Sequence, residues 1–398
     1  MSTTLIARNE DLARLRRDGY TVEVVRGVGT HLLVHDIPYV NSQRQVCRGT
    51  LYAPLELDGE RTISPVANHQ TWFIGEHPCN SDGSILTDVQ HGSATQSMGD
   101  NITVNHDFSV KPRNGVLYKD YHEKFVRYIN LIGAPAAAVD STATARVYKA
   151  VPEESDDSVF HYSNTATSRA GIAGASDRLA MKRVAIVGLG GTGSYVLDAI
   201  TKTPVREIHL FDGDRFIQHN AFRSPGAPGL ADLTAPMKVE YFGNIYSRMH
   251  RHIIQHPYYL DDTSVSELAG FDFAFICVDR GSVRKMITDA LHELRVPYID
   301  TGIGVRKGKG DQLGGQVRVT HGTPDRHDHL PDRASLADRP PEEDLYSTNI
   351  QIVELNALSA LMAVIRWKKF CGFYVDDGSE YHSVYRIATG TITRTDLT

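Results

Sequence analysis

The chain has 398 residues and a formal net charge of −6, so it lacks the excess of basic residues that nucleic-acid-binding domains usually carry. Its hydrophobic content of 41% and charged content of 23% are those of an ordinary globular protein, and its length is sufficient for two domains. The four cysteines are scattered and form no CxxC pair, which argues against a disulfide framework and against a zinc ribbon.

Residues 1–155 have the pattern of a separate N-terminal α+β domain. Residues 1–20 carry charges throughout and contain no apolar run, so we expect no signal peptide. Short β-type runs such as 31–40 and 71–77 are broken by Gly, Pro and Asn. Residues 117–133 then repeat apolar side chains at helical spacing and predict one buried helix face, formed by Leu117, Tyr121, Phe125, Tyr128 and Ile132.

Residues 76–86, EHPCNSDGSIL, resemble the stretch around the active site of ubiquitin-conjugating enzymes. Leu86 stands where the catalytic cysteine of those enzymes would be, and Cys79 lies elsewhere, so we expect no working conjugating domain. We expect a recognition or oligomerisation domain instead, an inactive relative of that fold. His77, Cys79 and Asp82 are an alternative small site, but the Asp-Gly step also fits an ordinary turn.

From about residue 160 to 305, short apolar runs alternate with helical patterns. The expected strands are 184–188, 207–212, 271–279 and 297–302, and the expected helices are 194–200 and 282–294. This alternation predicts parallel strands that helices cover on both faces. We therefore expect residues 156–398 to form an α/β domain with a doubly wound, mostly parallel, Rossmann-like sheet.

Gly188, Gly190 and Gly193 form a GxGxxG motif directly after the first of these strands, and Gly191 lies inside it. At the start of a helix, such a loop binds phosphate groups through free backbone N–H groups. Asp212 ends the next strand, at the spacing where an acid usually binds ribose hydroxyls. These features alone fit an NAD(P)-dependent oxidoreductase equally well.

A second set of polar residues favours a triphosphate over a dinucleotide. Asp214, Asn220 and Arg223 follow shortly after the ribose acid, where a dinucleotide enzyme needs no such group. Breaking the bond between α- and β-phosphates requires cations and a held magnesium ion. We predict that Arg223 and Lys238 contact the phosphates and that Asp279, at the end of a strand, binds the metal. There is no GxxxxGK[ST] motif, which excludes a P-loop.

Residues 305–349 are polar and rich in Gly, Pro and Asp, and they predict a long crossover loop. The His-Asp-His sequence at 327–329 is a weak metal candidate because no third ligand lies nearby, and a solvated loop that closes over the substrate is favoured. Residues 383–396 alternate like a strand. Residues 350–367 predict a buried helix rather than a membrane span, because polar side chains interrupt the apolar run: Gln351, Glu354, Asn356 and Arg366.

The segment from about 160 to 305 resembles the adenylyltransferases that activate ubiquitin and ubiquitin-like proteins, whose bacterial relatives serve thiamine and molybdopterin biosynthesis. The whole chain is also similar to bacterial members of that family that have an uncharacterised N-terminal domain and are found near mobile or defence-type gene clusters. Five pieces carry the resemblance: GLGGTGS at 188–194, D-x-D-x5-N-x2-R at 212–223, PMK ending at Lys238, VDRGSVR at 278–284 and SRAG at 168–171.

The resemblance implies an enzyme that uses ATP and Mg²⁺ to adenylate the C-terminal glycine of a ubiquitin-like protein, giving an acyl-adenylate and pyrophosphate. It also implies a homodimer, since in many relatives the arginine at the position of Arg169 reaches the triphosphate from the other subunit. The remaining implied roles are ribose binding by Asp212 beside Asp214, phosphate contacts from Asn220, Arg223 and Lys238, and metal binding by Asp279.

Many relatives carry a cysteine in the crossover loop that takes the acyl group as a thioester. Residues 302–369 contain no cysteine here, and we expect Cys277 and Cys371 to lie in the core. The acyl-adenylate would then pass directly to a partner such as a conjugating-enzyme-like acceptor. A hydroxyl such as Ser335 or Ser347 is an alternative acceptor that would form an ester.

We therefore predict a cytoplasmic, homodimeric adenylyltransferase of the ubiquitin-activating type, with neither nucleic acid nor membrane as a partner. Three alternatives remain: the same chemistry on a small acid or peptide, an NAD(P)-dependent oxidoreductase, and a non-catalytic scaffold that binds a nucleotide. Arg223 and Lys238 argue against the oxidoreductase. The complete set of arginine, lysine and aspartate argues against the scaffold.

Overall fold

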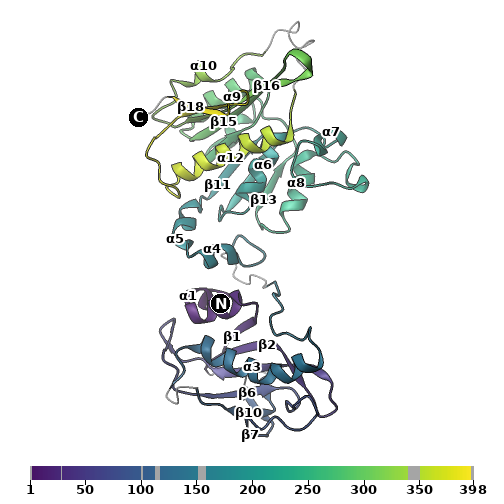
Figure 1. The fold of residues 1–398 in the computed structure, drawn as a ribbon. Coiled ribbons are helices and arrows are strands. Elements are labelled where there is room, and N and C mark those ends of the chain that lie inside the picture. The colour runs from purple at the N-terminus through teal and green to yellow at the C-terminus, as the bar shows by residue number, and fades with distance from the viewer. Residues whose placement is uncertain are drawn as a thin grey trace. The chain divides into compact units, whose positions relative to one another are not determined.

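A computed structural model describes residues 2–27, 29–99, 102–112, 117–150, 158–338 and 350–395, with the side chains of residues 2–4 and 168–169 left out (Figure 1). The chain divides into two compact units. Unit 1 comprises Met1–Asp156 with Tyr162–Gly171, and unit 2 comprises Asp157–His161 with Ile172–Thr398. Each unit is described by itself below.

Unit 1 is built on an antiparallel sheet with the strand order β1-β2-β3-β6-β10-β7, and two further pairs of short strands, β4-β5 and β8-β9, lie outside it. The core forms where strand side chains such as Val34 and Phe73 meet the helices. The elements are α1 (Ser2–Arg8), α2 (Glu10–Arg17), β1 (Thr21–Arg26), β2 (Thr30–Val40), β3 (Val46–Pro54), β4 (Leu57–Asp58), β5 (Arg61–Thr62), β6 (Gln70–Ile74), β7 (Gln90–Gly92), β8 (Gln96–Gly99), β9 (Ile102–Val104), β10 (His106–Ser109), α3 (Tyr121–Val139) and α4 (Thr165–Ala170).

Helix α3 confirms most of the predicted helix face. Tyr121, Phe125, Tyr128 and Ile132 are all buried in the core of unit 1, whereas Leu117 precedes the helix and is only partly buried. The helix begins late because Asp120 is its N-cap and accepts the backbone N–H of Glu123 at 2.8 Å. A capped start of this kind fixes where the first turn forms.

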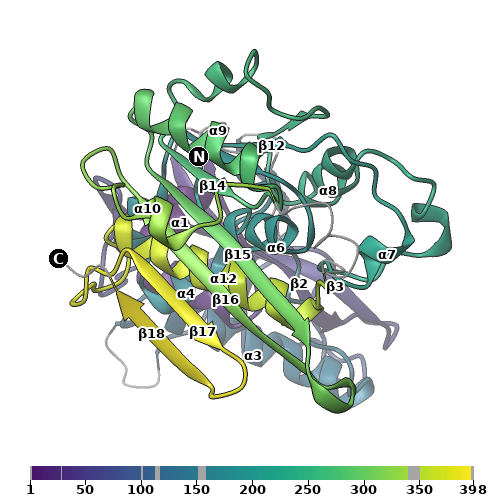
Figure 2. The same ribbon diagram turned by 90° about the horizontal axis from the view of Figure 1, so that it is seen from above.

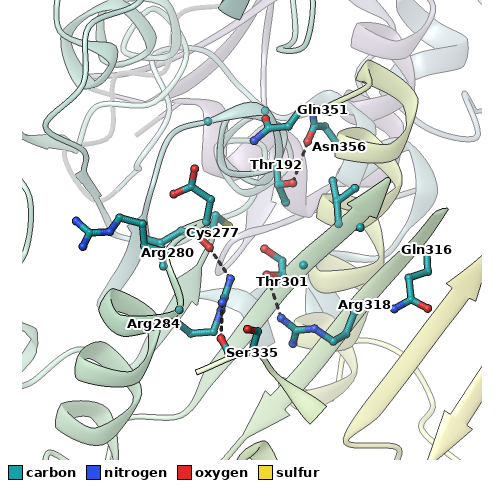
Figure 3. Close-up of a pocket in the computed structure, with 18 of the residues that line it drawn as sticks. Thr192, Cys277, Arg280, Arg284, Thr301, Gln316, Arg318, Ser335, Gln351 and Asn356 are labelled. Atoms are coloured by element: carbon teal, nitrogen blue, oxygen red, sulfur yellow. Dashed lines mark hydrogen bonds between the residues drawn. The ribbon is translucent and has the colours of Figure 1, made fainter. Parts of the chain in front are cut away.

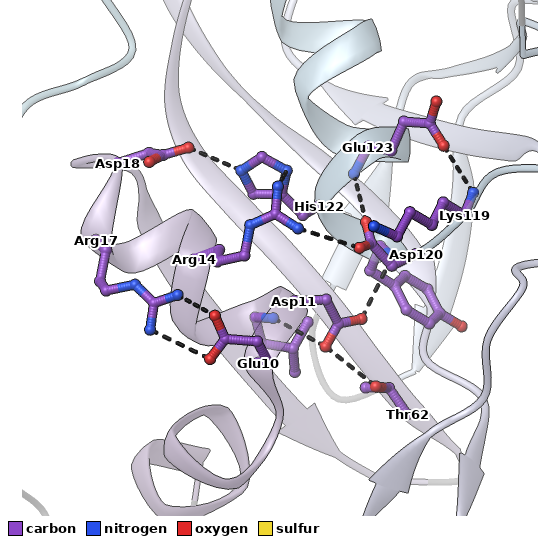
Figure 4. A network of polar contacts seen from close by, with 12 residues as sticks. Glu10, Asp11, Arg14, Arg17, Asp18, Thr62, Lys119, Asp120, His122 and Glu123 are labelled. Carbon is purple, nitrogen blue, oxygen red and sulfur yellow. Dashed lines mark hydrogen bonds and ion pairs between the residues drawn. The ribbon is translucent and has the colours of Figure 1, made fainter. Parts of the chain in front are cut away.

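A polar network holds α2 against the start of α3 (Figure 4). Asp11 on α2 accepts the backbone N–H of Tyr121 at 3.3 Å, and Arg14 pairs with Asp120 at 3.3 Å. His122 joins the same network through Asp18, at 2.7 Å. Because Asp11 satisfies an N–H group that the first helical turn leaves without an intrahelical partner, the contact stabilises both helices.

The stretch that resembles a conjugating-enzyme site forms a turn. Asp82 accepts the backbone N–H of Ser84 at 2.9 Å, and Gly83 has a φ of 86°, which favours glycine. The Cys79 thiol is buried and donates to the carbonyl of His77, and burial raises its pKa. Leu86 is buried as well. The thiol is therefore a poor nucleophile.

Unit 2 contains an eight-stranded sheet with the order β13-β12-β11-β14-β15-β16-β17-β18. The first five strands run parallel and the last three continue antiparallel. Its elements are α5 (Ala173–Ser176), β11 (Arg183–Val187), α6 (Gly191–Ile200), β12 (Glu207–Phe211), α7 (Gln218–Ala221), α8 (Lys238–Tyr246), β13 (Ile253–His256), β14 (Phe273–Ile276), α9 (Gly281–Glu293), β15 (Tyr298–Lys307), β16 (Leu313–Gly322), α10 (Leu330–Arg333), α12 (Val353–Phe370), β17 (His382–Arg386) and β18 (Thr391–Thr395), with short 3₁₀ turns between them.

Alternate residues of the central strand β11 enter two different cores. Val184 and Ile186 pack with side chains of α6, α8 and α12, while Ala185 and Val187 pack with side chains of α9. Helices therefore cover both faces of the sheet, as the apolar runs of the sequence predicted. The fold class is confirmed: a doubly wound, mostly parallel α/β sheet with a separate N-terminal α+β unit.

The predicted crossover loop at 305–349 needs a correction over its first part. Residues 305–322 belong to the long hairpin of β15 and β16, which pair from Tyr298↔Gly322 to Lys307↔Leu313 (Figure 2). Glycines in this stretch suggested a loop, but their backbones still pair where a neighbouring strand is present. The segment at 383–396 contains a second hairpin, β17 and β18. The predicted buried helix is α12, which begins at Val353 and ends at Phe370.

In the part of the chain that the structure describes, no helix combines the length and the hydropathy that a membrane span requires.

Lys124 on α3 is an unusual member of the core of unit 1. Its side chain is fully buried, and its Nζ donates to the carbonyl of Asn68 at 2.8 Å. Burial lowers the pKa of Lys124 from 10.5 to about 7. The folded unit therefore binds fewer protons than the unfolded chain between these two values, so its stability falls as the pH is lowered through this window.

We predict that the melting temperature of unit 1 rises between about pH 7 and about pH 9.5, and that Lys124→Met removes this rise. The chain has two tryptophans, and Trp72 lies in unit 1. Thermal unfolding followed by Trp72 fluorescence in a Trp367→Phe background therefore reports on this unit. Equal pH slopes with and without Lys124 would contradict the assignment.

Candidate active site

The glycine loop joins β11 to α6, and its glycines are required for different reasons. Gly188 has a φ of 90°, and a Cβ there would lie 2.8 Å from the carbonyl oxygen of Cys277. A Cβ on Gly193 would lie 1.8 Å from the carbonyl oxygen of Gly188, so α6 packs directly on the turn. Gly190 has no heavy atom near its Cβ position and faces open space, at the N-terminus of α6. The free N–H groups of that terminus favour an anion there.

Asp212, predicted to bind ribose, holds the glycine loop to the end of β12. Its Oδ2 accepts the backbone N–H of Leu189 at 2.6 Å, and its Oδ1 accepts that of Asp214 at 2.8 Å. Burial raises the pKa of Asp212, although the nearby Lys238 ammonium opposes the shift. The carboxylate therefore organises the loop before any ligand binds.

Lys238, at the first position of α8, is buried between two acids. Its Nζ lies 2.6 Å from Oδ2 of Asp214 and 3.5 Å from Oδ2 of Asp212. The Tyr259 hydroxyl donates to Asp214, and this hydrogen bond raises the pKa of Tyr259 to about 12. Although burial disfavours its charge, hydrogen bonds from Lys238 and Tyr259 hold the pKa of Asp214 below its usual range. The charge of Lys238 is thus neutralised within the protein.

Arg223 follows α7, and unlike Lys238 it is not held between acids in the described part of the chain. Among the described residues its half-buried guanidinium has no ion pair, and its buried Nε has no hydrogen-bond partner. Burial lowers the pKa of Arg223, while the charges of Asp279 and Asp214 oppose that shift. Asn220, predicted to contact a phosphate, uses its Oδ1 to accept the backbone N–H of Ile217 at 2.9 Å within its own turn.

A pocket of about 770 Å³ opens beside the glycine loop (Figure 3). Residues of the glycine loop, of the ends of β14 and β15, of α9 and β16 and of the start of α12 line it. Asp279 lies at its edge, exposed, directly before α9. The described residues that line it include Gly190, Gly191, Thr192, Cys277, Asp279, Arg280, Arg284, Thr301, Gly302, Gln316, Arg318, Arg333, Ser335, Gln351 and Asn356.

Two arginines that line this pocket share one buried carboxylate. Nε of Arg284 lies 2.8 Å from Oδ1 of Asp300, and Nη1 of Arg318 lies 2.6 Å from Oδ2. Asp300 is fully buried, and both arginines are nearly so. The group carries one positive charge in excess, which favours an anionic ligand in the pocket. Neither Asp300 nor Arg318 was predicted from the sequence; an acid inside the apolar strand 297–302 was the available signal.

The structure brings most of the predicted site residues together. Asp212, Asp214 and Lys238 are in direct contact, and Asp279 shares the pocket with the glycine loop. Arg169 lies on α4, but its side chain is outside the described residues.

Two of the candidate acyl acceptors on this chain, the cysteines, are poorly reactive. Burial raises the pKa of Cys277 to about 12 and that of Cys371 to about 12, so neither is a ready thiolate. Ser335 lines the pocket and its hydroxyl donates to the carbonyl of Ala337 at 3.2 Å. Ser347 lies outside the described residues.

The histidines at 327–329 have structural contacts. His327 stacks on His292 with ring centroids 3.8 Å apart, and Nε2 of buried His329 lies 3.0 Å from the carbonyl oxygen of His321. The described residues contain no cluster of three or more His, Cys, Asp or Glu side chains that could hold a metal ion.

Residues 162–376, more than half of the chain, match the ThiF family, and residues 10–165 match a domain of unknown function (DUF6791). Ubiquitin-like modifier-activating enzyme 5 of Drosophila persimilis is 30% identical over 167 residues, which are 39% of this chain and 43% of that protein. The same enzyme of Aedes aegypti is 27% identical over 154 residues, 35% of this chain and 38% of that protein. The chain thus spans about two fifths of the length of these curated relatives.

Two solved structures are also similar to this chain. The E. coli MccB structure with MccA-N7isoASN has a TM-score of 0.47 and 14% identity, covering 58% of this chain and 69% of that one. The PaaA structure has a TM-score of 0.43 and 15% identity, covering 56% of this chain and 74% of that one.

We predict different costs for removing members of the buried charge group. Asp300→Ala leaves two arginines without a counterion and should cost about 3–5 kcal/mol in the free energy of unfolding. Arg318→Met leaves a balanced pair of Arg284 and Asp300 and should cost clearly less. Urea unfolding of unit 2, followed by Trp367 fluorescence in a Trp72→Phe background, measures both. Equal costs would contradict the charge assignment.

Proposed function

The chain belongs to the ThiF family, and from that premise we propose that it adenylates a C-terminal carboxylate with ATP, giving an acyl-adenylate and pyrophosphate. A carboxylate oxygen attacks the α-phosphorus, the bond to the bridging oxygen breaks, and pyrophosphate leaves with the electron pair. The carboxylate is already a nucleophile, so the protein's task is to position the reactants and to neutralise developing charge.

The observation that carries this proposal is the guanidinium of Arg223, which has no ion pair among the described residues although the charge of Asp279 acts on it. An arginine with an unsatisfied buried Nε is ready to bind a phosphate oxygen. Asp279 exerts a charge effect on Arg223 and lines the same pocket as Gly190. A hydride-transferring dinucleotide enzyme has no need for this cation beside an exposed acid, whereas a triphosphate needs both.

The residues present fit a magnesium ion that arrives with the nucleotide. Mg²⁺ usually keeps several waters and is bound by one or two carboxylates together with substrate phosphates. Asp279, exposed at the edge of the pocket, meets this requirement without a larger cluster. When bound, the ion would neutralise charge on the departing pyrophosphate.

The remaining roles follow from the position of each residue. Asp212 and Asp214 lie where the ribose would bind, and Lys238 exchanges part of its contact with Asp214 for a phosphate oxygen. Asn220 keeps the turn that leads to Arg223 in place. The arginine on α4, Arg169, reaches the triphosphate of the partner subunit in a homodimer.

The proposed substrate is the C-terminal tail of a ubiquitin-like protein. One observation supports this class: the relatives reported above are ubiquitin-like modifier-activating enzymes. Since Cys277 and Cys371 are poor nucleophiles, the acyl group passes from the adenylate directly to a partner's acceptor.

Exchange of radiolabelled pyrophosphate into ATP, in the presence of a panel of β-grasp proteins and peptides with free C-terminal carboxylates, tests this function. We expect exchange with at least one substrate and its loss, by about a hundredfold or more, in Arg223→Ala and Lys238→Ala. Arg215→Ala is the matched control, since Arg215 lies on the same loop but is exposed. Binding of NAD(P)H without binding of ATP would refute the proposal.

Asp279→Ala should weaken ATP binding roughly tenfold in the presence of MgCl₂ and leave it unchanged in the presence of a chelator. Isothermal titration of ATP under both conditions measures this. Asp338→Ala is the control, because Asp338 lines the same pocket but is paired with Arg280. A metal effect that survives in Asp279→Ala would place the ion elsewhere.

If Arg169 acts across a subunit interface, then mixing inactive Arg169→Ala with inactive Lys238→Ala should restore about a quarter of the exchange activity, as expected for random mixing of two inactive subunits. Restored activity in the mixture, measured against each variant alone, is the expected result. No recovery in mixtures that are shown to form mixed dimers would place Arg169 in the pocket of its own subunit.

A further inference from the structure

Asn356, in the first turn of α12, connects two parts of the nucleotide site that are far apart in the sequence. It is 1% exposed. Its Oδ1 accepts the hydroxyl of Thr192 on the glycine-loop helix α6 at 3.2 Å (Figure 3). Its Nδ2 donates to the main-chain carbonyl of Arg223 at 3.2 Å. One side-chain amide thus bridges the phosphate-binding loop and the segment that carries the unpaired arginine.

The orientation of this amide is determined by its partners. A backbone carbonyl only accepts hydrogen bonds, so Nδ2 must face Arg223 and Oδ1 must face Thr192. The amide also lies directly against Gly191, where an added Cβ would be 2.0 Å from Nδ2. Any side chain at 191 would displace the amide, which gives this glycine a role beyond the approach of phosphate.

The backbone of Arg223 is held at two points. Its N–H donates to the carbonyl of Asn220 at 3.1 Å, and its carbonyl accepts from Asn356. Its side chain has neither an ion pair nor a partner for Nε among the described residues. The direction of the guanidinium therefore depends on where the backbone of Arg223 is fixed. Asn356 supplies the contact that connects this backbone to the glycine-loop helix.

We propose that Asn356 is a positioning residue that sets the distance between the glycine loop and Arg223, so that one triphosphate reaches both. The inference rests on the proposed function, since it assumes a triphosphate in this site. Asn356 does not touch the phosphates in this account. It acts through the backbone of Arg223, and its loss affects the binding of groups that Arg223 contacts.

If Asn356 had only a general structural role, its removal would have a different effect on ligand binding. A buried amide that merely filled space on α12 would, when removed, weaken all ligands equally or none. Ser359, one turn later on the same helix, provides the comparison, because it is fully buried and its hydroxyl has no hydrogen-bond partner among the described residues. Ser359→Ala should leave nucleotide binding unchanged.

The experiment is a double-mutant cycle on nucleotide affinity, measured by isothermal titration with Mg²⁺ and with ATP or AMP as the probe. We expect Asn356→Ala to weaken ATP binding about five- to tenfold, because the hydrogen bond that holds the carbonyl of Arg223 is lost, and to leave AMP binding within about twofold. In an Arg223→Ala background the same substitution should have no further effect on ATP.

Two results would overturn the inference: equal loss of ATP and AMP binding in Asn356→Ala, or a loss of ATP binding that persists unchanged without Arg223. If Asn356→Ala does not fold, Thr192→Val breaks the same bridge from its other end and enters the same cycle. Failure of the unmodified protein to bind ATP at all would instead refute the proposed function, so the two failures are distinguishable.

Discussion

The geometry of the candidate site depends on the buried carboxylate of Asp212. By accepting the backbone N–H of Leu189, it fixes the glycine loop against the end of β12, and it also helps to hold the Lys238 ammonium. A buried carboxylate needs such partners, because its charge is otherwise too costly. As a consequence, the two cations of the site, Lys238 and Arg223, differ in their surroundings. Lys238 is neutralised by Asp212 and Asp214, whereas Arg223, which has no ion pair among the described residues, remains available to an anionic ligand.

The pocket as a whole also combines paired charges with charges that remain available to a ligand. Arg284 and Arg318, which line it, share the single buried carboxylate of Asp300, and Asp279 is exposed at its edge. Under the proposed function, the positive charge of the two arginines would stabilise phosphate and carboxylate oxygens, and Asp279 would hold a metal ion. Preorganised charge of this kind requires no rearrangement at the moment of reaction, which is the main contribution an enzyme can make to an anhydride-forming step.

Local patterns in the sequence predicted the fold class, the glycine loop and the buried face of α3, because each depends on spacing within a few residues. The hairpin at 305–322 was not predicted, because the sequence of a glycine-rich strand resembles that of a loop when the strand that pairs with it is not known. Asp300, Arg318, Tyr259 and Asn356 were also missed. Each acts through a contact with a distant segment: Asn356 bridges residues 164 and 133 positions away, and no local pattern reports such a distance. The contacts of Lys238, an expected phosphate ligand, with Asp212 and Asp214 could not be predicted from the spacing of residues in the sequence either.

The central claim is that this pocket binds the phosphate chain of ATP for adenylate formation. The most direct test is a crystal structure of the full chain with Mg²⁺ and a non-hydrolysable ATP analogue. The account predicts that the guanidinium of Arg223 lies within hydrogen-bond distance of a phosphate oxygen, that Asp279 contacts the metal ion, and that the phosphates lie over Gly190. A complex in which the Arg223 side chain turns away from the nucleotide, or in which the analogue binds outside this pocket, would contradict it.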